Sequence, residues 1–91
     1  MITTGQKIAI TPTDRSRLPE TDLANVVFGR TFSDHMFVMD FQDGRWQQPR
    51  IQKYERMQMS PAAQVLHYCQ TIFEGLKAYR LVDGRAALFR P

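Results

Sequence analysis

The chain has 91 residues, a length that allows at most one small domain. Hydrophobic residues make up 43% of it and aromatic residues 11%, which favours a folded core and excludes a disordered chain. The formal net charge of +3 comes from arginines that are scattered along the sequence, so binding to nucleic acid is the least favoured class of function.

Cysteine content and hydropathy also restrict the compartment. The single cysteine, Cys69, excludes a disulfide within the chain and fits a reducing environment. No apolar run approaches the roughly 18 residues that span a membrane, and the first residues lack the apolar segment of a signal peptide. We therefore expect a cytoplasmic protein with no membrane partner.

Residues 1–24 are expected to form a polar N-terminal arm, because threonine and proline punctuate the stretch. A hairpin should follow. Residues 36–41 are rich in large apolar side chains, and Asp43-Gly44 is a strong signal for a tight turn. Residues 45–51 form the returning strand. Pro49 cannot donate to a ladder, which predicts that this strand lies at a sheet edge or ends near there.

A helix is expected between Pro61 and Gly75. Ser60 can cap it while Pro61 occupies the first helical position. Gly75 supplies the positive φ that favours a helix C-terminus. Apolar side chains between them recur at helical spacing and should share one face, with Cys69 as a small buried member; that face comprises Val65, Tyr68, Cys69, Ile72 and Phe73.

A second Asp-Gly pair, Asp83-Gly84, lies between the runs 76–82 and 85–90 and predicts a second hairpin. Two hairpins with one helix between them indicate an α+β fold, in which a mostly antiparallel sheet carries the helix on one face. One helix gives little cover to four strands, so either one sheet face is wet or more protein packs there.

Three segments of the chain resemble branched-chain amino-acid aminotransferases, which are pyridoxal-phosphate (PLP) enzymes of fold type IV. LHYCQTIFEGLKAYR at 66–80 is similar to the family's LHY-x-x-x-x-FEGLKAYR. FGRTFSDHMF at 28–37 and DGRAALFRP at 83–91 resemble its F-G-x-x-F-x-D-H-M and D-G-x-x-x-L-F-R-P segments. The segments occur in the family's order and spacing.

The resemblance implies that residues 25–91 are the first part of a small α/β domain, and that the larger PLP-binding domain is absent from this chain. The whole enzyme is expected to be a homodimer that transfers the amino group of leucine, isoleucine or valine to 2-oxoglutarate. Branched-chain amino acids, glutamate and 2-oxo acids are then its small-molecule partners. D-Amino-acid transamination and lyase chemistry are alternatives within the same fold type.

PLP chemistry needs a lysine for the Schiff base and groups that hold the pyridine nitrogen and the phosphate. The chain has three lysines, Lys7, Lys53 and Lys77. In the family, the Schiff-base lysine and the cofactor-anchoring residues follow the segment that ends the present chain, so they should lie beyond Pro91. We therefore assign no catalytic and no cofactor-binding residue, and we expect the chain to be inactive alone.

The resemblance does assign part of a substrate pocket. Three aromatic residues match family aromatics that line the cavity for a branched aliphatic side chain, namely Phe32, Tyr68 and Phe73. Large apolar walls suit a substrate side chain of this kind. The Tyr68 hydroxyl would give the same pocket a polar tip for glutamate. The competing interpretation places Tyr68 and Phe73 in a core, because both lie on the apolar face of the expected helix.

Two other classes of function fit less well. His35, His67 and Cys69 are not spaced as zinc ligands, so no metal site is expected. The alternative to an enzyme segment is a stand-alone interaction module that keeps this sheet without catalysis and binds a partner along an exposed edge or face.

Overall fold

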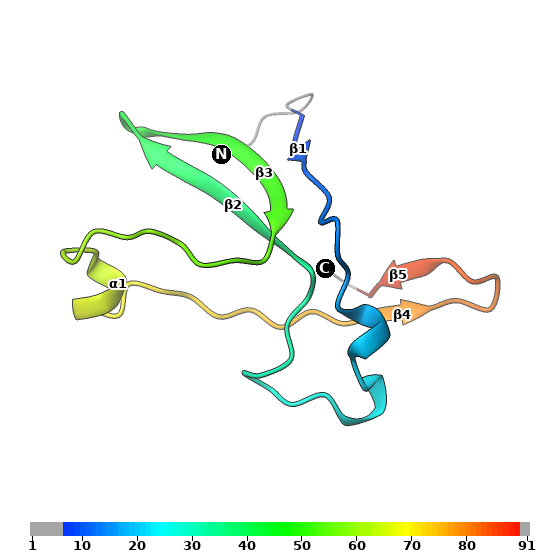
Figure 1. The fold of residues 1–91 in the computed structure, drawn as a ribbon. Coiled ribbons are helices and arrows are strands. Elements are labelled where there is room, and N and C mark those ends of the chain that lie inside the picture. The colour runs from blue at the N-terminus through cyan, green and yellow to red at the C-terminus, as the bar shows by residue number, and fades with distance from the viewer. Residues whose placement is uncertain (1–6, 90–91) are drawn as a thin grey trace. The chain divides into compact units, whose positions relative to one another are not determined.

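The computed structural model describes residues 7–89, and the chain divides into two units, residues 1–57 and 58–91 (Figure 1). Arg90, which ends the expected last strand, and Pro91 lie outside the described residues, as do residues 1–6 of the expected arm. Strands predominate over helix, as an α+β fold with antiparallel hairpins allows.

Unit 1 contains a three-stranded sheet with the order β1-β3-β2. β2 (His35–Gln42) and β3 (Arg45–Lys53) form the antiparallel hairpin that the sequence predicts. β1 (Ala9–Ile10) pairs in parallel with the far part of β3. Two short 3-10 helices, Leu18–Glu20 and Leu23–Asn25, lie between β1 and β2.

The turn between β2 and β3 is the predicted Asp43-Gly44 pair. Both residues have positive φ, 54° for Asp43 and 75° for Gly44. A two-residue type I′ loop requires this conformation at both positions, and aspartate and glycine tolerate it well. The ladder starts directly beside the loop with the pair Gln42↔Arg45, so the turn sets the register of the hairpin.

The expectation drawn from Pro49 is wrong. β3 continues past the proline, and it is the middle strand of its sheet. The register shifts between Val38 and Asp40, opposite this part of β3, and Gln48 has a φ of 54°. Such a β-bulge leaves one residue unpaired, so a buried proline is accommodated without losing a ladder hydrogen bond.

Unit 2 contains the one helix expected between the hairpins, but its predicted length is wrong. α1 spans only Gln64–His67. The Ser60 hydroxyl accepts from the Ala62 amide over 3.1 Å, so it caps a turn that precedes α1. A helix this short is marginal unless its apolar face packs on other elements, and Pro49 in β3 is the only buried residue among residues 7–89.

The backbone conformation of Cys69 explains where α1 ends. Cys69 has a φ of 53°, and this left-handed residue stops the helix. Cys69 is exposed, which corrects the expectation of a small buried side chain. Gly75 lies in the loop after α1 and is not in the positive-φ region, so its expected role as a helix stop is also wrong.

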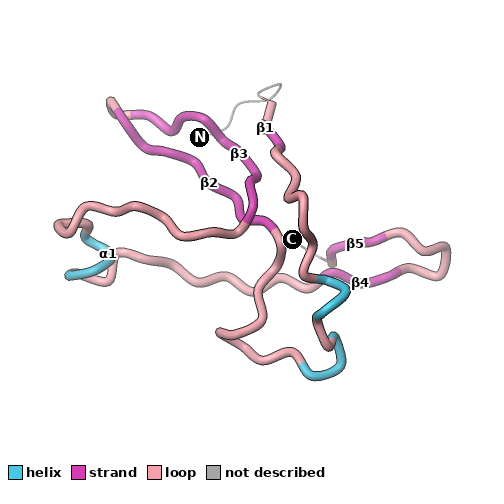
Figure 2. The backbone as a smooth tube through the Cα atoms, viewed as in Figure 1, coloured by secondary structure: helices cyan, strands magenta, loops and turns pink. Residues whose placement is uncertain are grey.

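The second predicted hairpin is confirmed, with shorter strands. β4 (Ala78–Arg80) and β5 (Ala86–Leu88) pair antiparallel in a separate two-stranded sheet. The four hairpin strands therefore do not form the single sheet expected from the sequence. Figure 2 shows loop conformation, drawn in pink, over most of the chain between β3 and β4. Within the described residues, no helix is long and apolar enough to cross a membrane.

Candidate functional site

The three aromatic residues assigned to the substrate pocket lie in different settings. Phe32 belongs to unit 1, three positions before β2, and it is 44% exposed. Tyr68 directly follows α1, and Phe73 lies in the loop toward β4. They are 81% and 78% exposed, so neither belongs to a core formed by the described residues of unit 2.

Phe32 has the most defined surroundings of the three. Its ring stacks on the Tyr54 ring with centroids 4.9 Å apart and planes inclined by 13°. The Arg17 guanidinium carbon lies 5.3 Å from the centroid of the same Tyr54 ring. Aromatic stacking and a cation–π contact each contribute about 0.5–1.5 kcal/mol, so the three side chains support one another.

The Asp34 carboxylate connects this cluster to the chain before it. The Ser16 hydroxyl donates to Asp34 Oδ2 over 2.6 Å, and the Arg17 amide donates to Oδ1 over 2.8 Å. These two hydrogen bonds, the Ser16 bond first, lower the pKa of Asp34. The Arg17 guanidinium donates to the Ser33 carbonyl, and its Nε lies 3.8 Å from Oδ1.

Backbone hydrogen bonds fix the base of the hairpin, which we define as Asp34 and Tyr54. The Tyr54 amide donates to the Asp34 carbonyl over 2.8 Å, one position beyond the last ladder pair, His35↔Lys53. The Thr13 amide donates to His35 Nε2 over 3.0 Å. Residues 13–17 are thereby attached to the hairpin base.

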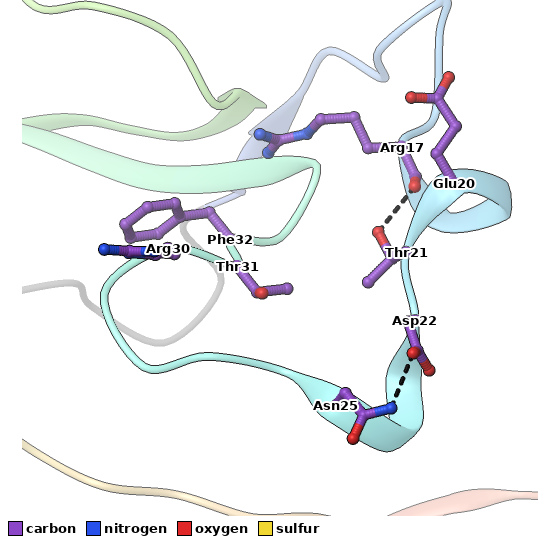
Figure 3. A pocket seen from close by; sticks show the side chains of 8 residues that line it. All are labelled: Arg17, Glu20, Thr21, Asp22, Asn25, Arg30, Thr31 and Phe32. Atoms are coloured by element: carbon purple, nitrogen blue, oxygen red, sulfur yellow. Dashed lines mark hydrogen bonds between the residues drawn. The ribbon is translucent and has the colours of Figure 1, made fainter.

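Phe32 lines two pockets that differ in the polarity of their lining. The first has a volume of about 360 Å³ and presents both guanidinium and carboxylate groups (Figure 3). In it, the Asn25 amide and then the Ala24 backbone amide donate to the Asp22 carboxylate and lower its pKa. Its lining residues are Arg17, Glu20, Thr21, Asp22, Asn25, Arg30, Thr31 and Phe32.

The second pocket has a volume of about 440 Å³ and is mainly apolar. Aliphatic side chains from both 3-10 helices form its wall together with the Phe32 ring. Its lining residues are Leu18, Thr21, Leu23, Val26, Thr31, Phe32, Ser33 and Asp34. Of the two pockets, this one has the more apolar lining, which suits a branched aliphatic side chain.

The described residues do not fit a PLP site. Lys53 ends β3 with its ammonium 3.6 Å from a Glu55 carboxylate oxygen, and Lys77 lies 5.8 Å from the Tyr79 ring centroid. Lys7, Lys53 and Lys77 are all exposed, whereas a Schiff-base lysine works in a site that excludes water. Residues 7–89 also contain no group of three or more histidine, cysteine, aspartate or glutamate side chains that could hold a metal ion.

Sequence reasoning missed the cluster around Tyr54. Arg17, Asp34 and Tyr54 are separated by 17 and 20 positions, and no local pattern connects residues this far apart. The available signal was Asp34, a carboxylate just before a strand, where it can accept hydrogen bonds from a neighbouring loop.

The chain is similar to curated branched-chain aminotransferases. It is 49% identical over 89 residues to branched-chain-amino-acid aminotransferase 2 of Bacillus subtilis (strain 168), covering 97% of this chain and 24% of that protein. Branched-chain-amino-acid transaminase 1 of the same organism is 51% identical over 71 residues, 77% of this chain and 20% of that protein.

A cytosolic branched-chain-amino-acid aminotransferase of Saccharomyces cerevisiae is 38% identical over 88 residues, which cover 96% of this chain and 23% of the relative. The chain thus spans about a quarter of the length of these relatives. No protein-family model matches it. The matches confirm the family that the three sequence segments indicated.

Proposed function

We propose that this chain is a segment of a branched-chain amino-acid aminotransferase, which transfers the amino group of leucine, isoleucine or valine to 2-oxoglutarate. One observation carries the proposal: the chain is 49% identical to such a protein over 97% of its own length. Because the chain spans about a quarter of that relative, the activity belongs to a longer protein. Glutamate and 2-oxo acids are its further substrates.

The cofactor of that longer protein is PLP, held by residues outside this chain. The exposed positions of the three lysines support the placement of the PLP-binding residues outside this chain, because none of the lysines lies where a Schiff base is protected from water. Residues 25–91 form the first part of the small domain of a fold-type IV enzyme, and residues 1–24 form its N-terminal arm. The whole protein is a cytoplasmic homodimer, and cytosolic relatives support the compartment.

The contribution of this segment is part of the wall of the substrate side-chain pocket, through Phe32, Tyr68 and Phe73. The apolar pocket beside Phe32 supports this role, because leucine, isoleucine and valine differ from other substrates in the aliphatic surface that they bury. Tyr68 and Phe73 are 81% and 78% exposed, and other parts of the longer protein complete the pocket that they line.

The test compares the 91-residue chain with the full-length protein. Each is mixed with PLP, reduced with borohydride and weighed by mass spectrometry, and leucine transamination is measured in parallel. We expect one adduct and activity in the full-length protein, and neither a stoichiometric adduct nor activity in the chain alone. A single adduct on Lys77 of the chain would refute the assignment of the cofactor to other residues.

The transamination assay, together with size-exclusion chromatography of the chain, also tests the alternative of a stand-alone interaction module. An interaction module would show no transamination in either form, and the 91-residue chain would be a soluble monomer by size-exclusion chromatography. Aggregation of the chain alone is the result expected of an enzyme segment, because Pro49 is the only buried residue among residues 7–89 and the large hydrophobic side chains are exposed or partly exposed.

A further inference from the structure

The Phe32 ring does not stand alone at the edge of the apolar pocket. The Tyr54 ring covers it in a near-parallel stack, with centroids 4.9 Å apart. Phe32 lies in the loop before β2, where backbone position alone leaves a phenylalanine ring free to rotate about χ1 and χ2. The stack on Tyr54 therefore restricts the orientation that the Phe32 ring presents to the pocket.

Tyr54 is held at both its backbone and its ring. Its amide donates to the Asp34 carbonyl over 2.8 Å, which prolongs the β2–β3 ladder to the position of Tyr54. Its ring lies 5.3 Å from the Arg17 guanidinium carbon. The position of the ring is thus tied to the three-stranded sheet of unit 1 and to Arg17, directly before the first 3-10 helix.

Arg17 is fixed in turn by three contacts with the segment that carries Phe32. Its amide donates to Asp34 Oδ1 over 2.8 Å, its Nε lies 3.8 Å from the same oxygen, and its guanidinium donates to the Ser33 carbonyl. Ser33 and Asp34 directly follow Phe32 in the chain. The contacts therefore form a closed circuit from Phe32 through Tyr54 and Arg17 back to the backbone beside Phe32.

We propose that Tyr54, held by Arg17, is a positioning residue that sets the orientation of the Phe32 ring and thereby the fit of the branched side chain. The inference rests on the proposed function and names residues that neither the sequence analysis nor the comparisons assign to the pocket. Neither Tyr54 nor Arg17 needs to contact the substrate, because both act through the Phe32 ring, which lines the substrate pocket.

The test is steady-state kinetics of leucine transamination by the full-length protein. Tyr54→Leu removes the stacking surface, and we expect kcat/KM for leucine to fall about tenfold, mainly through KM, because a misplaced wall weakens substrate binding. Tyr54→Phe is the matched control. It keeps the ring and loses only the hydroxyl, so its kcat/KM should stay within about twofold of the parent value.

A double-mutant cycle separates positioning from general support of the fold. If Tyr54 acts through Phe32, then Phe32→Leu combined with Tyr54→Leu should be no worse than Phe32→Leu alone. Multiplying effects of the two substitutions, or an unchanged KM in Tyr54→Leu, would overturn the proposal while the aminotransferase activity of the parent stands. A parent protein that converts none of the three amino acids would instead overturn the proposed function, and the positioning role with it.

A second variant covers the case in which Tyr54→Leu fails to fold. Arg17→Met removes the cation from the Tyr54 ring at a side chain that is 45% exposed, so no buried cavity results. We expect a rise in KM for leucine of about threefold, with Arg17→Lys intermediate because it keeps the charge but not the planar guanidinium. An Arg17→Met protein with the parent KM would contradict the proposal that Arg17 holds the Tyr54 ring in position.

Discussion

The two hairpins of this chain start from the same sequence signal and reach different degrees of structural support. Both contain an Asp-Gly pair, and in both the glycine has positive φ, 75° for Gly44 and 89° for Gly84. The β2–β3 hairpin has strands of eight and nine residues, whereas β4 and β5 have three residues each. An identical turn signal therefore specifies that a hairpin forms, but not how far its ladder extends.

Contacts from outside the hairpin account for part of the difference. β1 pairs with the far part of β3, and hydrogen bonds from Ser16 and Arg17 attach the preceding segment to the hairpin base at Asp34. Beyond its three residue pairs, the β4–β5 hairpin is closed by bonds within its own turn, such as the bond from the Leu81 amide to the Arg85 carbonyl of 2.8 Å. Tertiary attachment distinguishes a long ladder from a short one.

The largest effect is expected at the turn of the β2–β3 hairpin. Gly44→Val places a β-branched residue at a φ of 75°, and since no heavy atom would lie within 4 Å of the new Cβ, the cost is backbone strain alone. We expect the free energy of unfolding of the hairpin to fall by about 1–2 kcal/mol. Hydrogen exchange of the β2–β3 amides measures the loss.

Gly84→Val and Gly44→Asn are the matched variants. Gly84 also has open space around it, but it lies in a five-residue loop between Arg80 and Ala86, which can change type more easily than a two-residue loop. We expect a smaller loss for Gly84→Val, and almost none for Gly44→Asn because asparagine tolerates left-handed backbone. Equal losses for the two valine variants would show that ladder and loop length do not separate the hairpins.

The next effect concerns the end of α1. Cys69→Gly relieves a non-glycine residue at a φ of 53° and should raise the free energy of unfolding by up to about 1 kcal/mol. If α1 instead ran through position 69, as the apolar spacing predicts, glycine would lie inside a helix and cost about 1 kcal/mol. Urea denaturation of the full-length protein gives the sign, and Cys69→Ala is the control.

The control has opposite expectations in the two cases. Alanine at a left-handed position keeps the strain, so Cys69→Ala should change little if α1 ends as described. Alanine inside a helix has the highest propensity of all residues, so it should stabilise a continuous helix. A protein stabilised by alanine and destabilised by glycine would restore the helix predicted from the sequence.

These cases show which features the sequence could predict. Asp43-Gly44 and Asp83-Gly84 predicted both hairpins because the conformational requirement of a turn is met within two residues. The helix prediction rested on apolar spacing, which stabilises a helix only when its face packs on another element. Tyr68 and Phe73 on that face are largely exposed, so the described residues do not provide such packing.

The candidate site also combines a feature that local sequence predicts with contacts that only packing between distant segments creates. The aromatic residue Phe32 was assigned from a motif within ten consecutive residues, and its assignment to the pocket stays a prediction. The stack of Phe32 on Tyr54 and the cation–π contact of Arg17 with Tyr54 form only when distant segments meet at the hairpin base. Pro49 is a further example, because a register shift between β2 and β3, with the extra residue on β3 itself, accommodates it. Local rules do not contain information of this kind.

The smallest effect concerns the attachment of residues 16 and 17 to the base of the β2–β3 hairpin. Hydrogen bonds from Ser16 and Arg17 favour the charged form of Asp34 and lower its pKa below the ordinary value of 3.8. The folded pKa is depressed, so this attachment contributes stability above pH 3.8 and loses it as the pH falls through the lower folded pKa. The NMR shift of the Arg17 amide should therefore titrate with a midpoint below 3.8, whereas in Asp34→Asn that transition should vanish. A midpoint at or above 3.8 would mean that Ser16 and Arg17 do not hold the carboxylate in solution, and the hairpin base would then depend on the β2–β3 ladder alone.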